Sequence, residues 1–316
     1  MEFIFCYLAD LKLGAVTVPL NPAYPQHELA YFLSDSGARL LVTDSASRGL
    51  VEMMRTSLPG LQHVLYREEF GENLLERAKT FGGGSIETPV SPQDIALICY
   101  TSGTTGRPKG AMLSQMNLAS NIGSLMEAWG WTERDRFLHS LPLYHMHGLG
   151  VGLHGALAAG CYTLMHDRFE PEAVMETLER EKMTLFMGVP TFYHRFLGLP
   201  AQREYDLASM RLFVSGSAPL REETFHGFRE RFGHTILERY GMTETGMNIS
   251  NPLHGERRPG TVGFPLPGVE ARTANPETGD ILPTGEVGEI QLRGPNIFRG
   301  YWQKPRETEE RFTPDA

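Results

Sequence analysis

Hydroxyl groups, glycines and positive charges are concentrated in residues 100–110, which have the sequence YTSGTTGRPKG. The segment holds four aliphatic hydroxyls, three glycines and two cations, directly after a predicted buried strand. Glycine lets backbone N–H groups approach an anion closely, and hydroxyls donate further hydrogen bonds. Lys109 adds a point charge that suits a phosphate. The pattern predicts a cradle for a triphosphate, and a polar loop with an incidental lysine is the weaker alternative.

Two familiar nucleotide-binding patterns do not account for the sequence. The P-loop pattern G-x-x-x-x-G-K-[ST] cannot be aligned with residues 100–110. Residues 150–155 do read G-x-G-x-x-G, but a dinucleotide site needs a strand immediately before that motif. Residues 144–148 intervene here, and Asp167 follows too closely to be the ribose-binding acid. We therefore interpret these glycines as small residues where a helix packs closely.

Helices and strands are predicted to alternate along most of the chain. Gly14 ends the first helix, and residues 79–92 are predicted to be a loop. The predicted helices are 3–13, 27–36, 115–129, 170–181 and 220–232, and the predicted strands are 15–20, 39–43, 64–66, 95–100, 136–141, 185–190 and 212–215. Such alternation is typical of a layered α/β fold with mostly parallel sheets. After about residue 260, strand patterns at 269–273 and 288–293 predict a small antiparallel β unit.

The composition supports a folded protein and excludes several classes. The chain has 316 residues, of which 41% are hydrophobic, so it can form a core without disulfides. Its three cysteines, Cys6, Cys99 and Cys161, are far apart and form no C-x-x-C pair, which fits a reducing compartment. A net charge of −9 argues against a nucleic-acid-binding protein.

Residues 137–166 form a stretch without charged side chains, but they contain Pro142 and five histidines. This interruption favours a partly buried segment over a membrane helix, and we predict no stable membrane insertion. A cytoplasmic location is predicted, with mitochondria as the alternative, and the oligomeric state is left open.

Further segments resemble one enzyme family in the order that the family has them. Residues 100–110 resemble the phosphate-binding loop of adenylate-forming enzymes, the acyl-CoA synthetase and luciferase superfamily. The other matching segments are 141–148 (LPLYHMHG), 214–220 (VSGSAPL), 238–245 (ERYGMTET), 285–290 (GEVGEI) and 294–302. The resemblance covers essentially the whole chain. It implies the large N-terminal domain of these enzymes.

The resemblance implies a two-step ligation. A carboxylate is joined to AMP with loss of pyrophosphate, and the acyl group then passes to the thiol of coenzyme A. The implied cofactors are ATP, Mg²⁺ and coenzyme A as a co-substrate, and the implied partners are these small molecules and a carboxylic acid. The alternatives are a medium- or long-chain fatty-acid ligase, and a fragment that binds nucleotide and acid without turnover.

The resemblance also implies the site residues. Tyr240 would stack on adenine, Thr243 would hydrogen-bond the α-phosphate, and Glu244 would ligate Mg²⁺, which prefers oxygen ligands. The catalytic residues would be Lys109, His145, Thr243 and Glu244. The nucleotide contacts would come from Thr101, Ser102, Gly103, Thr104, Thr105, Gly106, Lys109, Gly216, Ser217, Ala218, Glu238, Arg239, Tyr240, Gly241, Met242 and Thr243. The alternative for Thr243 and Glu244 is a helix cap.

Within the superfamily, the chain is most similar to malonyl-CoA synthetases, on residues 187–195, 237–245 and 256–263. Malonate or methylmalonate carries a second carboxylate, which is costly to bury unless a cation pairs with it. Arginine suits that role because its planar fork binds a carboxylate bidentately. Arg195 and Arg257 are the predicted partners, and arginines on a solvated surface are the alternative.

His145 and Ser217 are predicted to line the acid pocket. A structural histidine is the alternative for His145, and so is a metal cluster with His147 and His154, although no third ligand spacing supports a metal.

The resemblance implies a domain organisation as well. Residues 1–260 are expected to be the α/β part of the AMP-binding domain, with the beginning of that domain missing. Residues 261–316 are expected to be its small β unit. The mobile C-terminal domain, with its adenylation lysine, would lie beyond residue 316.

Overall fold

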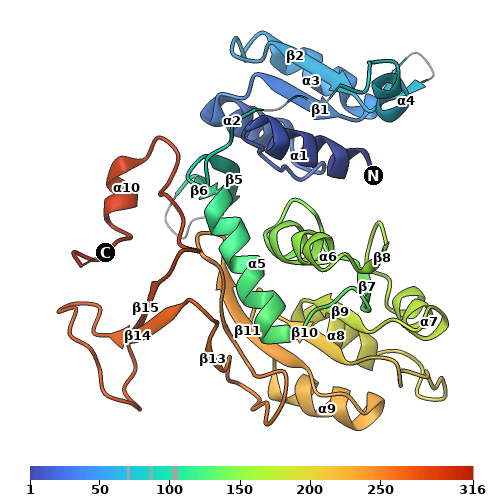
Figure 1. Ribbon diagram of the computed structural model, residues 1–316, viewed down its shortest axis with the longest axis vertical. Helices are drawn as coiled ribbons and strands as arrows, with labels where there is room; N and C mark the ends of the chain where they lie inside the picture. The colour runs from blue at the N-terminus through green and yellow to red at the C-terminus, as the bar shows by residue number, and fades with distance from the viewer. Residues whose placement is uncertain (70–71, 85, 87, 102–105, 316) are drawn as a thin grey trace. The chain divides into compact units, whose positions relative to one another are not determined.

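The computed structural model describes residues 1–69, 72–84, 86, 88–101 and 106–315 (Figure 1). The chain forms two compact units. The first consists of residues 1–115 and 299–314, and the second of residues 116–298 with the residues after 314. Each unit has a core of its own.

The first unit contains a small parallel sheet covered by helices. Its elements are α1 (Glu2–Leu13), α2 (Gln26–Ser36), β1 (Leu40–Thr43), the 3₁₀ turn η1 (Ser45–Ser47), α3 (Arg48–Arg55), β2 (His63–Tyr66), β3 (Glu68–Glu69), β4 (Glu72–Asn73), α4 (Leu74–Lys79), β5 (Ile95–Thr101), β6 (Lys109–Ser114) and α10 (Pro305–Glu309). Strands β1 and β2 pair in parallel. Leu33 from α2 and Met54 from α3 pack into one buried cluster with Leu58 and Leu61. Gly14, with φ of 67°, ends α1 as predicted, because glycine adopts this left-handed conformation without strain.

The hydroxyl-rich segment connects two antiparallel strands. Strands β5 and β6 form a hairpin in which Thr101 is opposite Lys109. Residues 299–302 run along the outer edge of β6, since Met112 N–H donates to the Gly300 carbonyl at 2.9 Å and Trp302 N–H donates to the Gly110 carbonyl at 2.7 Å. The sequence predicted β5 and missed β6.

The predicted strand at residues 15–20 is wrong. In this segment, all of which the structure describes, Thr17 alone pairs, through a single bridge to Leu97 of β5. Val16 is 44% exposed rather than buried. Pro19 has no N–H group with which to continue a ladder, so the pairing ends there.

The second unit is built on a seven-stranded sheet. Its elements are α5 (Gln115–Trp129, whose first residue belongs to the first unit), β7 (Arg136–His139), the π-helix η2 (His147–Leu153), α6 (His154–Ala159), β8 (Tyr162–Met165), α7 (Pro171–Arg180), β9 (Leu185–Gly188), α8 (Pro190–Leu197), β10 (Leu212–Ser215), α9 (Glu222–Phe232), β11 (Leu237–Met242), β12 (Gly246–Ser250), β13 (Phe264–Pro265), β14 (Glu270–Ala274) and β15 (Glu289–Arg293). The strand order is β13-β12-β11-β10-β9-β7-β8. Strands β7 to β11 pair in parallel, whereas β12 and β13 are antiparallel. Strands β14 and β15 form a separate antiparallel pair. The predicted α/β fold is therefore confirmed.

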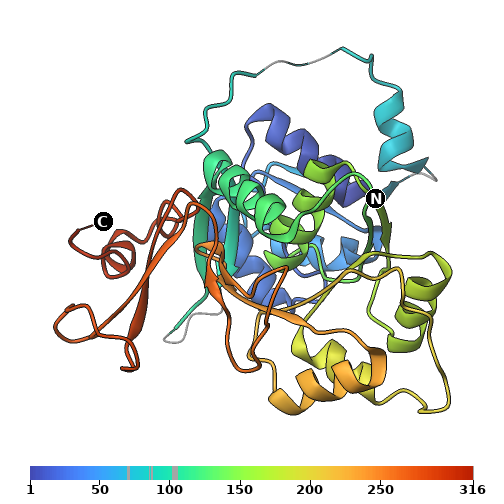
Figure 2. The same ribbon diagram turned by 60° about the horizontal axis from the view of Figure 1, so that its bottom comes forward.

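Helices cover both faces of this sheet, with α5 on one face and α7, α8 and α9 on the other (Figures 1 and 2). The strands follow the two-residue period that such a sandwich requires. Leu185 and Met187 of β9 pack in the cluster that contains α5, and Phe186 between them packs in the opposite cluster. In β10, Val214 and Phe213 divide between the two clusters in the same way. The parallel strands are thus buried on both faces, as parallel sheets normally are.

The uncharged segment 137–166 is partly buried, and two of its glycines lie in close packing contacts, as predicted. A Cβ on Gly150 would lie 2.3 Å from Met146 Cε, and a Cβ on Gly155 would lie 2.1 Å from a ring carbon of Trp131. Both glycines lie in the run formed by η2 and α6. Within the residues that the structure describes, no helix is both long and apolar enough to span a bilayer.

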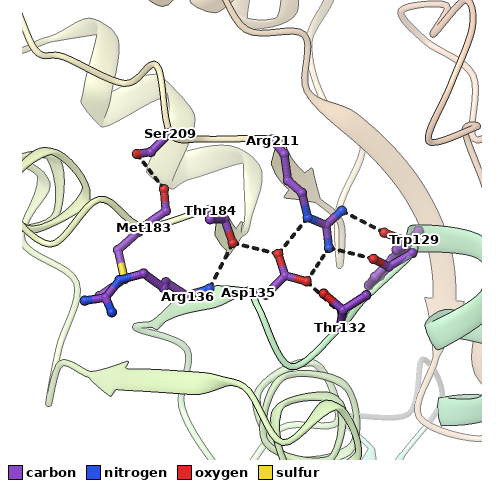
Figure 3. A network of polar contacts seen from close by, with 9 residues as sticks. Trp129, Thr132, Asp135, Arg136, Met183, Thr184, Ser209 and Arg211 are labelled. Atoms are coloured by element: carbon purple, nitrogen blue, oxygen red, sulfur yellow. Dashed lines mark hydrogen bonds and ion pairs between the residues drawn. The ribbon is translucent and has the colours of Figure 1, made fainter.

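An ion pair joins the amino ends of three neighbouring strands (Figure 3). Asp135, Thr184 and Arg211 directly precede β7, β9 and β10. Arg211 donates from Nε to Asp135 Oδ1 and from Nη2 to Oδ2, both at 2.7 Å, and Thr184 donates to Oδ1 at 2.7 Å. Nη1 of Arg211 donates to the Trp129 carbonyl at the end of α5 at 2.8 Å. The Asp135 side chain is only 4% exposed, so this pair holds the strands and α5 in register from inside the protein.

We predict that Asp135→Asn lowers the free energy of unfolding by about 2 kcal/mol near pH 7, because Arg211 keeps a partly buried charge and loses its counter-charge. Burial alone would raise the pKa of Asp135, but hydrogen bonds from Arg211, Thr132 and Thr184 hold it below its ordinary value of 3.8. A lowered pKa contributes stability above that ordinary value, and the contribution is lost as the pH falls through the folded-state pKa.

Urea unfolding of parent and variant, measured from neutral to acidic pH, tests this prediction. The difference between the two should be complete near pH 7 and shrink below about pH 4. Glu256→Gln is the control, because Glu256 forms an exposed pair with Arg258 and should change nothing measurable. A difference that does not vary with pH would contradict the prediction.

Candidate active site

Thr101 is the last residue of β5 and Lys109 the first of β6, so they pair with each other at the end of the hairpin where the two strands are connected. The ammonium of Lys109 lies 4.8 Å from the centroid of the Tyr301 ring, in a cation–π contact. Gly106 is also within the described part of the segment. Four further predicted phosphate contacts lie outside the described residues, namely Ser102, Gly103, Thr104 and Thr105.

In the second unit, the predicted site residues gather where the parallel strands end. His139 is the last residue of β7, and Gly216, Ser217 and Ala218 follow β10 directly. The segment from Glu238 through Gly241 and Met242 lies in β11. In open parallel sheets, ligands bind beyond the carboxyl ends of the strands. The sheet therefore brings these segments to the edge at which a ligand is expected.

Thr243 and Glu244 lie on a tight turn between β11 and β12, not at the start of a helix, so the helix-cap alternative does not hold. Two hydrogen bonds from residues 296–298 hold the backbone of this turn. Phe298 N–H donates to the Glu244 carbonyl at 2.8 Å, and Asn296 Nδ2 donates to the Thr245 carbonyl at 2.7 Å. The backbone is thus fixed, and the side chains of Thr243 and Glu244 remain partly exposed.

Glu244 places negative charge close to Tyr240. Burial raises the pKa of the Tyr240 hydroxyl, and the charge of Glu244 raises it further. Among the described residues, no group of three or more His, Cys, Asp or Glu side chains could hold a metal, and this includes the trio of His145, His147 and His154. One partly buried carboxylate still fits Mg²⁺, which proteins commonly hold with one or two carboxylates and the phosphates of a substrate.

His147 and Ser217 form a partly buried contact directly after β10. The Oγ of Ser217 lies 3.3 Å from Nδ1 of His147, which is only 6% exposed. Ser217 has a φ of 72°, a strained conformation for a residue with a side chain, and such strain is concentrated at functional sites. His145, which we predicted to line the pocket, is exposed and its ring packs against Tyr144. The interior histidine of this motif is His147.

Arg239 is a buried cation for which the described residues supply no ion pair. Its side chain is 3% exposed, and neither Nε nor Nη2 has a hydrogen-bond partner among the described residues. Burial lowers its pKa to about 9. A Cβ on Gly216 would lie 2.3 Å from Cζ of Arg239, so the glycine is required for the guanidinium to fit beneath the loop. Since a buried charge is costly unless an anion pairs with it, this geometry predicts an anion at Arg239.

Other buried side-chain atoms also have no hydrogen-bond partner among the described residues. They lie directly after β7, at the end of β10, at the start of η2 and in β11, where Glu238 is opposite Ser215, and they are Ser140 Oγ, Ser215 Oγ, His147 Nε2 and Glu238 Oε2. The other oxygen of Glu238, Oε1, accepts from Leu220 N–H at 2.9 Å, and burial raises the pKa of this carboxyl. Proteins pair nearly all of their buried polar atoms. A concentration of unpaired ones at this edge of the sheet indicates a polar ligand.

The two arginines predicted to bind a second carboxylate contact other groups in the structure. Arg195 is half-exposed, 3.5 Å from the Glu170 carboxylate. Arg257 donates to three backbone carbonyls, those of Thr235 at 2.6 Å, Leu253 at 2.8 Å and Pro252 at 3.0 Å. Among the residues described, neither guanidinium has a buried nitrogen without a partner, so the structure offers no support for their predicted role.

The sequence assigned Arg239 to the nucleotide by resemblance and did not indicate that its side chain is buried. It lies in the buried first half of the strand Leu237–Met242, where its charge needs an anion to offset it.

The sheet is mostly parallel, has helices on both faces, and carries buried polar groups at the carboxyl ends of its strands. These features are typical of an α/β domain that binds a small polar ligand. Residues 1–302 match the family described as AMP-binding enzyme, and the chain belongs to that family.

Several relatives have names that state what they act on. The mitochondrial malonate–CoA ligase ACSF3 of Xenopus laevis is 37% identical to this chain and is matched over all of it and 60% of its own length. The malonate–CoA ligase of Arabidopsis thaliana is 35% identical, over all of this chain and 54% of its own. The crystal structure of ATP-bound MatB from Rhodopseudomonas palustris is 43% identical, with a TM-score of 0.93 over all of this chain and 62% of that chain. The chain thus spans about 60% of the length of such relatives.

We predict that His139 stays neutral in the folded protein well below its ordinary pKa. Burial lowers the pKa of this imidazole to about 4. The unfolded chain therefore takes up a proton at higher pH than the folded chain does. The stability that His139 contributes is complete above its ordinary pKa of 6.5 and is lost as the pH falls towards 4.

An NMR titration of the histidine ring protons should give a midpoint near 4 for His139. Between neutral pH and about pH 5, His139 should account for a fall of about 1–2 kcal/mol in the free energy of unfolding of the parent. Urea unfolding of His139→Gln should lack this part of the fall. A midpoint near the ordinary value would show that the imidazole is not desolvated as described.

Proposed function

We propose that this chain is the nucleotide- and acid-binding part of an ATP-dependent ligase that activates a dicarboxylic acid of the malonate class. The acid would first form an acyl-adenylate with release of pyrophosphate, and the acyl group would then pass to coenzyme A. The observation that carries the proposal is the buried, unpaired guanidinium of Arg239 beside Ser217 and His147. Membership of the AMP-binding family and similarity to malonate–CoA ligases support it.

The chemistry requires that a carboxylate oxygen become a good leaving group. Attack on the α-phosphate of ATP achieves this if the charge that develops on phosphorus and pyrophosphate is stabilised. We assign Thr243 to hydrogen-bond the α-phosphate and Lys109 to bind the outer phosphates. Tyr240 would stack on the adenine. Glu244 would hold Mg²⁺, which when bound neutralises phosphate charge.

A dicarboxylate fits Arg239 better than a simple fatty acid does. The carboxylate that does not react would accept from the two unpaired nitrogens, Nε and Nη2, in the bidentate geometry that arginine favours. Ser217 would donate a further hydrogen bond. An alkyl chain in the same position would leave the guanidinium buried and unpaired, which costs several kcal/mol. Burial also keeps the pKa of His147 well below its ordinary value, with Arg239 contributing, so this imidazole adds no second positive charge.

A fatty-acid ligase is the second candidate, because the long-chain-fatty-acid–CoA ligase of Bacillus subtilis is 30% identical over 97% of this chain. A third possibility is that these residues bind nucleotide and acid without turnover. A thioester-formation screen across mono- and dicarboxylic acids, run with this chain and with a version extended beyond residue 316, distinguishes the three.

We predict that this chain binds Mg·ATP, and that Lys109→Ala and Glu244→Ala each weaken binding by about ten-fold or more, since each removes a charge that contacts phosphate or metal. Equilibrium dialysis with labelled ATP measures the effect. Lys182→Ala and Glu256→Ala are matched controls, because both side chains form exposed surface pairs. No binding by the parent chain would overturn the proposed nucleotide site.

We predict that Arg239→Met weakens malonate binding by about 30-fold or more, because the second carboxylate loses its only buried counter-charge among the described residues. Binding of butyrate, which has no second carboxylate, should change far less. Arg195→Met and Arg257→Met are the controls, and neither should alter the preference for malonate. Calorimetric titration of both acids in the presence of Mg·ATP measures these affinities. Equal losses for the two acids in Arg239→Met would remove the dicarboxylate assignment.

A further inference from the structure

Two side chains of α2 hold the two ends of the hydroxyl-rich segment. The hydroxyl of Tyr31 donates to the Pro108 carbonyl at 2.7 Å, directly before Lys109. The hydroxyl of Tyr100, directly before Thr101, donates to Asp35 Oδ2 at 2.7 Å. Tyr31 and Asp35 are four residues apart, so they lie on the same face of the helix. One helical turn thus contacts both flanks of residues 101–107.

Asp35 also connects this turn to the strand-like segment beside β6. Its carbonyl accepts from Trp302 Nε1 at 3.0 Å, and its Oδ1 lies 3.9 Å from Lys304 Nζ. Trp302 is itself paired with Gly110 of β6. The carboxylate side chain is 13% exposed, so these contacts are largely shielded from solvent. Helix α2, both hairpin strands and residues 299–304 therefore form one connected polar and backbone network.

Aromatic packing limits sideways movement at the same place. The rings of Phe32 and Tyr100 have centroids 4.7 Å apart, and those of Tyr31 and Tyr100 have centroids 6.2 Å apart. Burial raises the pKa of the Tyr100 hydroxyl, and its hydrogen bond to Asp35 raises it further. The phenol therefore stays protonated and remains the donor in that bond.

A phosphate-binding residue benefits from such support because ordering it on binding costs conformational entropy. Donors that are already in place bind an anion without that cost. Fixing Pro108 and Tyr100 sets the positions of their neighbours Lys109 and Thr101.

We propose that Tyr31 and Asp35 are positioning residues that hold both ends of the phosphate-binding segment against α2. The inference rests on the proposed function of that segment as the site for the outer phosphates of ATP. It assigns a role to a helix that contributes no side chain to the predicted contacts with nucleotide or acid.

Tyr31→Phe and Asp35→Ala test the proposal, because each removes one partner of these hydrogen bonds. Each variant should weaken Mg·ATP binding by about five- to ten-fold, as expected for loss of one well-placed hydrogen bond. Binding of AMP should change less than about two-fold, because AMP lacks the outer phosphates and general damage to the fold would weaken both nucleotides. Hydrogen–deuterium exchange should become faster in a peptide covering residues 106–114 and stay unchanged in the second unit.

Tyr162→Phe is the control, since it makes the same chemical change at a ring that is 47% exposed, and it should alter neither affinity nor exchange. Unchanged exchange at residues 106–114 in both variants would overturn the proposal, and so would equal losses of ATP and AMP affinity. If the parent chain binds no ATP, the proposed nucleotide site fails instead, and the exchange measurement alone then decides whether Tyr31 and Asp35 hold the segment.

Discussion

The cost of burying an unpaired guanidinium is the constraint that explains most of the site. Arg239 lies in the interior because β11 is a central strand, and its charge excludes other cations from the surroundings. Gly216 has no side chain, which leaves room for Cζ. Ser217 keeps a strained backbone while it contacts His147, which burial and the arginine hold neutral. These features are consistent with one another once an anion is expected to complete the cluster.

The amino and carboxyl ends of the parallel strands differ in whether their buried polar groups are paired. At the amino edge, the carboxylate of Asp135 is fully paired by Arg211, Thr184 and a backbone N–H. At the carboxyl ends, Ser215 Oγ and the Nε and Nη2 atoms of Arg239 are buried with no hydrogen-bond partner among the described residues. Because strand register is fixed at the paired edge, the unpaired groups keep their positions without pairing with one another. The paired groups at the amino ends thus stabilise the sheet while polar groups at the carboxyl ends stay unpaired.

The sequence predicted helices and strands well where apolar residues repeat regularly, and poorly where a single residue or a short irregular pattern decides the structure. The helix expected at 115–129 coincides with α5, since its apolar residues repeat at the helical period. The strand expected at 15–20 is absent because Pro19 ends pairing, and β6 was missed because KGAMLS lacks a clear alternation. The structure places Thr243 and Glu244 directly after β11 and Ser217 directly after β10, and their roles stay predictions. The pairing of each arginine depends on tertiary contacts, so Arg257 and Arg239 could not be told apart from spacing.

The pairing of Thr101 with Lys109 has a consequence for how this chain can vary. Successive side chains in a strand point to opposite faces, so a slip of one residue reverses every side chain beyond it. Adding or deleting one residue within 110–114 of β6 would therefore either turn Lys109 to the other face of the hairpin or force a bulge. Insertions should be tolerated poorly in this strand during evolution. The register of β6 thus constrains the site as much as the presence of a lysine at position 109 does.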